Sequence, residues 1–307
     1  MCKCIKNNIE GRVKLAILRT ENLTYIYGEG TPFQKTAVDN VTLEIQKGEI
    51  IGVIGHTGSG KSTLIQHFNG LLKPTSGKVF FNGVDIWAGK KVLPDLRFKV
   101  GLVFQYPEYQ IFEETVYKDI AYGPSNMKLD KDEIKRCVTE TADILGITSD
   151  MLNRSPFELS GGQKRRVAIA GVMAMRPEVL ILDEPTAGLD PRGRYTILEL
   201  IKKYNKTTGC TVLIVSHSME DMAEYAQRII VMNQSGLFCF DKTADVFARS
   251  EEISQMGLDV PQITKVFNEL KKSGIVFDDE IYTVRYAKEK ILEYISRRDG
   301  TGLCSKI

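Results

Sequence analysis

The stretch Gly55–Thr63, which reads G-H-T-G-S-G-K-S-T, constrains the fold of this chain more than any other. It follows the apolar, β-branched run 49–54, which is typical of a buried strand, and it precedes 64–70, which reads as a helix ended by glycine. Glycines at 55, 58 and 60 let the backbone approach an anion, which then faces the loop N–H groups and the N-terminus of the helix. The pattern predicts a phosphate-binding loop between a strand and a helix.

Two side chains of this loop receive chemical roles. Lys61 is expected to reach the β and γ phosphates of a bound triphosphate, and the Ser62 hydroxyl to ligate Mg²⁺. A single histidine is weak evidence for a functional site, so neither His56 nor His67 is assigned a chemical role of its own. A glycine-rich turn with an accidental lysine is disfavoured, because every fixed position of the motif matches in the right context. The predicted nucleotide contacts are Gly55, His56, Thr57, Gly58, Ser59, Gly60, Lys61, Ser62 and Thr63.

Composition excludes several classes of protein. With 41 basic and 39 acidic side chains in 307 residues, the chain has no overall charge footprint for nucleic acid, and its length suggests about two domains. No run approaches the roughly 18 consecutive apolar residues of a membrane helix. Six scattered cysteines read as reduced thiols of a cytoplasmic protein, and Cys2-x-Cys4 lacks the second pair of a metal site, which favours a disordered tail.

The rest of the chain reads as an α/β domain followed by a small helical piece. Residues 1–16 are expected to be disordered, a nucleotide-binding domain to span 17–248, and an accessory region 249–307. Helices are expected at 113–121, 131–145 and 287–294, together with one that has Ile263, Val266, Phe267 and Leu270 on one face; the tail 297–307 is expected to be frayed. Strands are expected at 16–27, 37–45, 78–82, 100–104, 179–182 and 211–215, with a hairpin formed by 228–232 and 237–240.

The C-terminal piece is too small to bury a core of its own. It should therefore pack on the first domain or on a neighbouring protein.

Two carboxylates end the apolar run 179–182. Asp183, at the tip of a strand beside the phosphate loop, is expected to hold Mg²⁺ together with Ser62, because this ion prefers hard oxygen ligands. Glu184 is then placed to orient and polarise the attacking water. An ordinary acidic turn would not explain why the pair ends a buried strand downstream of a phosphate loop.

Residues 159–163 read Leu-Ser-Gly-Gly-Gln and precede a helix, so Ser160, Gly161, Gly162 and Gln163 form a second anion receptor at a helix N-terminus. With this motif the chain resembles the ATP-binding cassette ATPases. The resemblance implies an α/β fold with a RecA-like core, an antiparallel β subdomain, a helical insert at about 106–165 and a small C-terminal α-rich extension. It also implies that the motif of one subunit closes over ATP held by another.

The resemblance assigns further residues to the site. Gln105 matches the glutamine that contacts Mg²⁺ and water, Asp190 ends the loop that crosses the dimer interface, and His217 matches the switch histidine near the γ-phosphate. Tyr27 resembles the aromatic residue that stacks on adenine, with Tyr25 as the competing candidate. The implied catalytic residues are Lys61, Gln105, Glu184 and His217, and the implied metal ligands are Ser62, Gln105 and Asp183.

The sequences of several segments indicate a subfamily of these ATPases. Residues 30–33, 105–116, 119–124 and 156–160 resemble the A-type ATPases of energy-coupling factor transporters, and within them the second paralogue. This likeness implies an ATP hydrolase at the cytoplasmic face of the cell membrane, paired with a paralogous cassette. Its further partners would be an integral membrane T component and, indirectly, S components that bind vitamins or other micronutrients.

Two other functions stay open from the sequence. One is the homodimeric ATPase of a dedicated cobalt or nickel importer, whose core motifs would look the same. The other is a soluble cassette ATPase acting on chromosomes or ribosomes. Such proteins carry long coiled-coil or zinc-bearing insertions or two cassettes in one chain, and this sequence shows neither.

Overall fold

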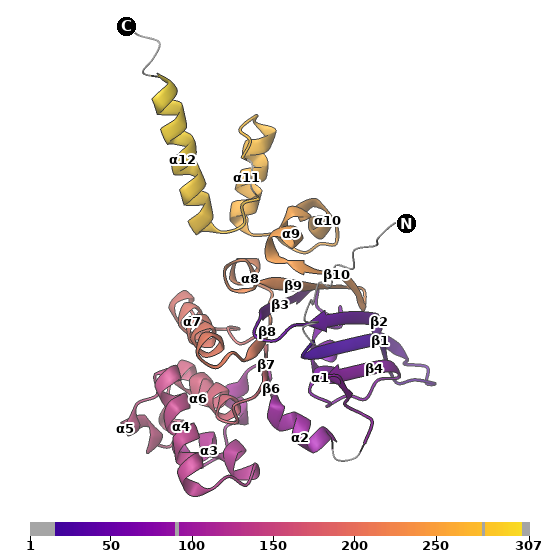
Figure 1. Ribbon diagram of the computed structural model, residues 1–307, viewed down its shortest axis with the longest axis vertical. Helices are drawn as coiled ribbons and strands as arrows, with labels where there is room; N and C mark the ends of the chain where they lie inside the picture. The colour runs from indigo at the N-terminus through magenta and orange to yellow at the C-terminus, as the bar shows by residue number, and fades with distance from the viewer. Residues whose placement is uncertain (1–15, 90–91, 278–279, 303–307) are drawn as a thin grey trace, which may run out of the picture.

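The computed structural model describes residues 16–89, 92–277 and 280–302. The predicted disorder of the N-terminal tail, the Cys2-x-Cys4 pair, Cys304 and the last five residues of the chain lie outside these ranges. Figure 1 shows a body built from two sheets and surrounding helices, with two C-terminal helices projecting from it.

A six-stranded sheet forms the centre of the body. Five of its strands, including all the inner ones, run parallel, and the remaining edge strand pairs antiparallel with its neighbour, as the predicted hairpin requires. The middle strands are almost wholly apolar because helices or the second sheet cover both of their faces. In spatial order the strands are β10 (Gly236–Lys242), β9 (Arg228–Asn233), β3 (Ile50–Gly55), β8 (Thr211–Val215), β7 (Val179–Asp183) and β6 (Val100–Val103).

A four-stranded antiparallel sheet packs beside it. Its order is β2 (Lys35–Ile45), β1 (Leu18–Tyr27), β4 (Ser76–Phe81) and β5 (Val84–Asp85). The Asp39 amide donates a 2.8 Å hydrogen bond to the Ser235 carbonyl and so joins β2 to the β9–β10 turn. Helix α1 (Lys61–Phe68) contributes Leu64 and Phe68 to the core that the two sheets share.

Helices form the opposite side of the central sheet, with α7 (Pro191–Thr208) and α8 (Met219–Tyr225) flanking β8 in sequence. The predicted helix 131–145 is confirmed as α4 (Lys131–Leu145), since Asp130 caps its start and Gly146 ends it with φ +63°. The predicted helix 113–121 begins later because Thr115 caps it, and it continues to residue 126. The predicted insert contains η1 (Pro107–Gln110), α3 (Val116–Asn126), α4 (Lys131–Leu145), α5 (Ser149–Leu152), η2 (Pro156–Glu158) and the start of α6 (Gly161–Met173).

The C-terminal piece packs on the body mainly at its beginning and through Tyr282, whose ring lies 6.0 Å from that of Phe247. Leu258 and Val260 join the main core, whereas Phe267, Ile281 and Ala287 form a small cluster of their own. Val266, expected on the apolar face, is 50% exposed. The elements after β10 are α9 (Thr243–Ala248), α10 (Ser250–Gln255), α11 (Gln262–Lys272) and α12 (Val284–Gly302).

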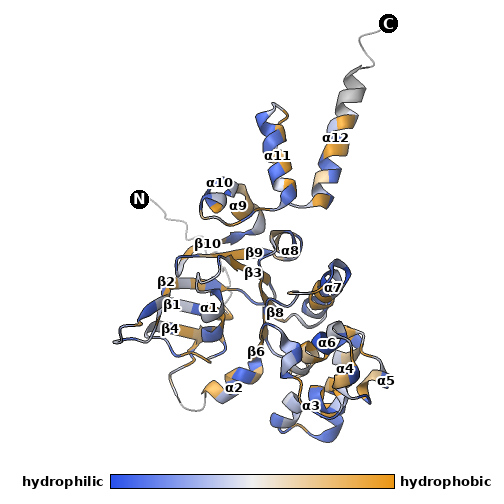
Figure 2. Cartoon of the chain, turned by 180° about the vertical axis from the view of Figure 1, so that it is seen from behind, coloured by the Kyte–Doolittle hydropathy of each residue, from blue (hydrophilic) through white to orange (hydrophobic). Residues whose placement is uncertain are grey.

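Helix α12 is longer than the predicted segment 287–294, so residues 297–302 are helical rather than frayed. Apolar residues recur along the part of this helix nearer the body in Figure 2, where the helix stands clear of the sheets. None of the helices in the described ranges is long and apolar enough to cross a membrane. Three of the predicted thiols, Cys137, Cys210 and Cys239, are buried and unbridged.

Candidate functional site

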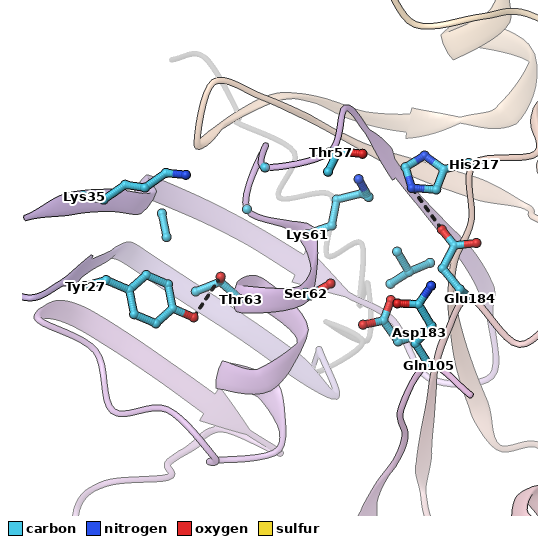
Figure 3. A pocket seen from close by; sticks show the side chains of 14 residues that line it. Tyr27, Lys35, Thr57, Lys61, Ser62, Thr63, Gln105, Asp183, Glu184 and His217 are labelled. Carbon is cyan, nitrogen blue, oxygen red and sulfur yellow. Dashed lines mark hydrogen bonds and ion pairs between the residues drawn. The ribbon is translucent and has the colours of Figure 1, made fainter. Parts of the chain in front are cut away.

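A pocket of about 360 Å³ lies where α1 and the carboxyl ends of β6, β7 and β8 face β1 and β2 (Figure 3). Eleven of the predicted site residues meet there, although they are spread over most of the sequence. The parallel strands bring them together because their carboxyl ends share one edge of the sheet. The predicted residues that line the pocket are Tyr27, Thr57, Gly58, Gly60, Lys61, Ser62, Thr63, Gln105, Asp183, Glu184 and His217.

The loop between β3 and α1 fits closely against the neighbouring backbone. A Cβ on Gly60 (φ +99°) would lie 2.1 Å from the Ala37 carbonyl oxygen, and one on Gly55 (φ +154°) would lie 2.4 Å from that of Met232. Only glycine tolerates these positions. No side chain caps the N-terminus of α1, so its first backbone amides are available to an anion.

Lys61 is held within the loop. Its Nζ donates to the Gly55 carbonyl at 2.6 Å and to the His56 carbonyl at 2.9 Å. Burial lowers the pKa of Lys61, while the charges of Glu184 and Asp183 raise it. The ammonium is thus anchored at the base of the pocket, facing the two carboxylates.

Asp183, Ser62 and Gln105 offer oxygen atoms on one side of Lys61. Burial raises the pKa of Asp183, and the hydrogen bond from Ser62 and the charge of Lys61 oppose this shift. Within the described ranges no group of three or more His, Cys, Asp or Glu side chains could hold a metal by itself. The donor set fits Mg²⁺, which takes few protein oxygens and completes its shell with water and phosphate oxygens.

Glu184 follows Asp183 at the end of β7 and has the left-handed φ of +50°, which is rare for this residue type. Its Oε1 is buried and makes no hydrogen bond within the described structure, and it lies 3.4 Å from Nε2 of His217. Burial and the neighbouring charge of Asp183 raise the pKa of Glu184 to about 7. A carboxylate with so little solvation is a stronger base than one in water.

The other end of the pocket is aromatic. Tyr27 lines it, and its hydroxyl lies 3.3 Å from that of Thr63. Tyr25 instead packs edge-on against His67, is partly buried against the core between the sheets, and does not line this pocket. Lys35, opposite Tyr27 in the β1–β2 register, also lines the pocket. Sequence reasoning missed Lys35, since only strand pairing brings it to Tyr27.

The second anion receptor lies elsewhere. Ser160, Gly162 and Gln163 line a separate pocket with Asp190 and the start of α7. Ser160 and Gln163 form a reciprocal cap at the start of α6, and open space surrounds Gly161. Asp190 caps α7 by accepting a 2.8 Å hydrogen bond from the Gly193 amide. The chain therefore presents its two predicted nucleotide-binding surfaces at different places.

Three loop residues do not line the main pocket. Gly55 faces Met232, and the Ser59 hydroxyl is buried without a hydrogen-bond partner within the described structure. His56 turns outward, and its Nε2 lies 2.7 Å from the carbonyl oxygen of Met256 in the C-terminal piece. No local pattern signals this contact, because its two partners are 200 residues apart.

Comparison with known proteins places this geometry in a family. Residues 38–187 match the ABC transporter family. The "Energy-coupling factor transporter ATP-binding protein EcfA2" of Caldanaerobacter subterraneus subsp. tengcongensis is 52% identical over 278 residues, 91% of this chain and 97% of that protein. The protein of the same description from Bacillus subtilis is 48% identical over 264 residues, 85% of this chain and 96% of the relative.

Solved structures agree with the fold. The structure of cbiO1 from Clostridium perfringens, described as part of the ABC transporter complex cbiONQ, has a TM-score of 0.70 and 40% identity; the match covers 81% of this chain and 97% of that one. The dimeric cassette MJ0796 has a TM-score of 0.66 and 30% identity, with 74% and 98% covered. The predicted cassette fold is confirmed, and the chain belongs to the ATP-binding proteins of energy-coupling factor transporters.

Proposed function

We propose that this protein hydrolyses ATP to drive import through an energy-coupling factor transporter. The observation that carries the proposal is the meeting of Lys61, Asp183, Glu184 and His217 in one pocket beside the uncapped N-terminus of α1. This arrangement combines an anion receptor, oxygen ligands for Mg²⁺ and a base with a raised pKa.

The chemistry rests on positioning and electrostatics. Lys61 and the first amides of α1 stabilise charge on the transferred phosphoryl group. Glu184 accepts a proton from the attacking water. His217, whose Nε2 lies 3.4 Å from Oε1 of Glu184, helps to orient that water. When bound at Ser62, Asp183 and Gln105, Mg²⁺ would neutralise phosphate charge. Tyr27 stacks on the base and fixes the orientation of the nucleotide.

The active unit is a pair of cassettes. Ser160–Gln163 and Asp190 face a pocket of their own, so one chain carries two half-sites rather than one whole site. A partner can complete both by offering its own signature helix to Lys61 and its own loop to Ser160. A similar cassette, MJ0796, is described as dimeric. We propose a paralogous chain as the partner, because the sequence of residues 105–116 resembles that of the second paralogue.

The proposed docking surface for the membrane T component is aromatic. Around η1 and the start of α3 and α6, Tyr109 is 85% exposed, Phe112 59% and Phe157 67%. Exposed apolar groups gathered in this way mark an interaction site. Docking there would hold the protein at the cytoplasmic face of the membrane.

The two alternative functions are less well supported. The relatives that cover about nine tenths of this chain at about half identity are described as energy-coupling factor proteins. This speaks against a soluble cassette acting on chromosomes or ribosomes. It also disfavours a dedicated cobalt or nickel importer.

Copurification tests the proposal. The protein is tagged in its native cell, the membranes are solubilised gently, and the copurifying proteins are identified by mass spectrometry. We expect a second cassette, a polytopic membrane protein and small substrate-binding membrane proteins, with ATP hydrolysis by the recovered complex. Recovery as a soluble homodimer, or with DNA or ribosomes, would overturn the proposal.

A further inference from the structure

A buried arginine connects three segments of the cassette. Arg165, on α6 two residues after the signature motif, is only 3% exposed. Its Nε lies 3.0 Å from Oε2 of Glu108 and its Nη2 2.7 Å from Oε1, which is a bidentate pair with η1. Its Nη1 donates to the carbonyl oxygens of Pro185, at 3.3 Å, and Ala187. Four hydrogen bonds thus join α6 to η1 and to the turn after β7.

The two ends of this network stand next to the reacting residues. Pro185 directly follows Glu184, and the Ala187 amide closes the turn by donating to the Glu184 carbonyl at 3.1 Å. Arg165 therefore fixes carbonyls within the turn that holds Glu184 in its left-handed conformation. Without those bonds the carbonyl oxygens of Pro185 and Ala187 would lose their buried cationic donor.

The same guanidinium also anchors the segment that carries Gln105, through its two bonds to Glu108. Only Tyr106, with φ +54°, and Pro107 separate Gln105 from Glu108, so this short connection has little freedom. The Arg165 guanidinium also lies 6.0 Å from the centre of the Tyr106 ring. Fixing the Glu108 carboxylate fixes the direction in which Gln105 enters the pocket.

We infer that Arg165 is a positioning residue for ATP hydrolysis, holding Glu184 and Gln105 in place through the turn at 185–187 and through Glu108. The inference rests on the proposed function. The hydrogen-bond partners of Arg165 are Glu108, Pro185 and Ala187, and none of these three lines the nucleotide pocket. Its loss should therefore change turnover and leave nucleotide affinity nearly unaltered.

The test compares variants in the complex recovered from the native cell. For Arg165→Met we expect kcat for ATP to fall at least about tenfold, because small misplacements of reacting groups are costly, with KM within about twofold. Arg165→Lys should fall similarly, since one ammonium cannot replace a planar fork that serves a carboxylate and two carbonyls. Arg176→Met removes an exposed ion pair with Glu140 and should keep the wild-type kcat.

A double variant separates positioning from folding. Glu108→Met combined with Arg165→Met leaves no buried charge unpaired, although the carbonyls of Pro185 and Ala187 still lose their donor. The double variant should therefore be more thermally stable than Arg165→Met without regaining the wild-type kcat. Recovery of kcat together with stability would assign Arg165 a purely structural role and overturn the inference. Wild-type kcat in Arg165→Met would do the same.

Amide hydrogen exchange in the nucleotide-free complex gives a readout independent of turnover. Exchange at residues 106–110 and 185–189 should accelerate in Arg165→Met and stay unchanged in Arg176→Met. If the wild-type complex hydrolyses no ATP, the proposed function fails, and unchanged exchange at both segments would refute the connection itself.

Discussion

Replacing Gly60 by alanine tests whether the phosphate loop depends on its contact with β2. The new Cβ would lie 2.1 Å from the carbonyl oxygen of Ala37, a backbone atom of a paired strand. That oxygen belongs to the backbone of β2, so it cannot retreat without moving the strand itself. The positive φ of residue 60 costs roughly 1–2 kcal/mol for alanine. Overpacking against the backbone costs roughly 1–3 kcal/mol more.

Gly58→Ala is the matched control. Residue 58 also has a positive φ, +82°, but nothing lies within 4 Å of an added Cβ. We therefore expect Gly58→Ala to lose only the conformational part, about 1–2 kcal/mol. Comparing the two variants isolates the steric part, because both remove a glycine with left-handed φ from the same loop.

The assay is urea unfolding of the nucleotide-free protein, followed by fluorescence of Trp87. This residue is the sole tryptophan, and it packs against the core between the two sheets. The free energy of unfolding should fall about 1–3 kcal/mol further in Gly60→Ala than in Gly58→Ala. Equal losses in the two variants would refute the argument that the loop is braced against β2.

Three further predictions concern single charges. Lys61→Ala should weaken ATP binding at least about tenfold, since it removes a charged donor; equilibrium binding of a fluorescent ATP analogue measures this, and unchanged affinity counts against the loop assignment. Glu184→Gln should keep ATP binding but lose about a hundredfold or more in kcat, and wild-type-like hydrolysis would exclude Glu184 as the base. Burial alone would raise the pKa of Glu108, but the hydrogen bonds and charge of Arg165 hold this pKa below its ordinary value. The ionised Glu108 therefore stabilises the fold at neutral pH, and this stabilisation is lost as the pH falls through the lowered pKa. Glu108→Gln should accordingly unfold more easily in urea than the wild type at pH 7, by about 1–3 kcal/mol, with the gap closing in acid; a gap that does not depend on pH would contradict this.

Local signals predicted the parts of the site that a short segment encodes. The loop at 55–63 and the pair Asp183–Glu184 each follow a buried strand, and both lie where that context placed them. Helix α4 was bounded correctly because its cap residues, Asp130 and Gly146, stand in the sequence. In these cases the chemistry and the element that positions it are neighbours along the chain.

Features that depend on the approach of distant segments could not be predicted in this way. Lys35 reaches the pocket through its pairing with Tyr27, and Arg165 gains its role only when η1 and the turn after β7 meet α6. The sequence predicts only residues 287–294 of α12. The start of the helix packs through Ala287 in the small C-terminal cluster, whereas Ile295 further along is 46% exposed.

The hydrogen bond from His56 to the Met256 carbonyl ties the phosphate loop to the C-terminal piece. Met256 lies beyond the predicted boundary at residue 248, and its carbonyl oxygen is within hydrogen-bond distance of a side chain of the phosphate loop. Gly257, with φ +73°, leaves room for that contact, since an added Cβ would lie 2.8 Å from the His56 ring. Cutting the protein at 248 would therefore alter its phosphate loop as directly as a substitution within that loop.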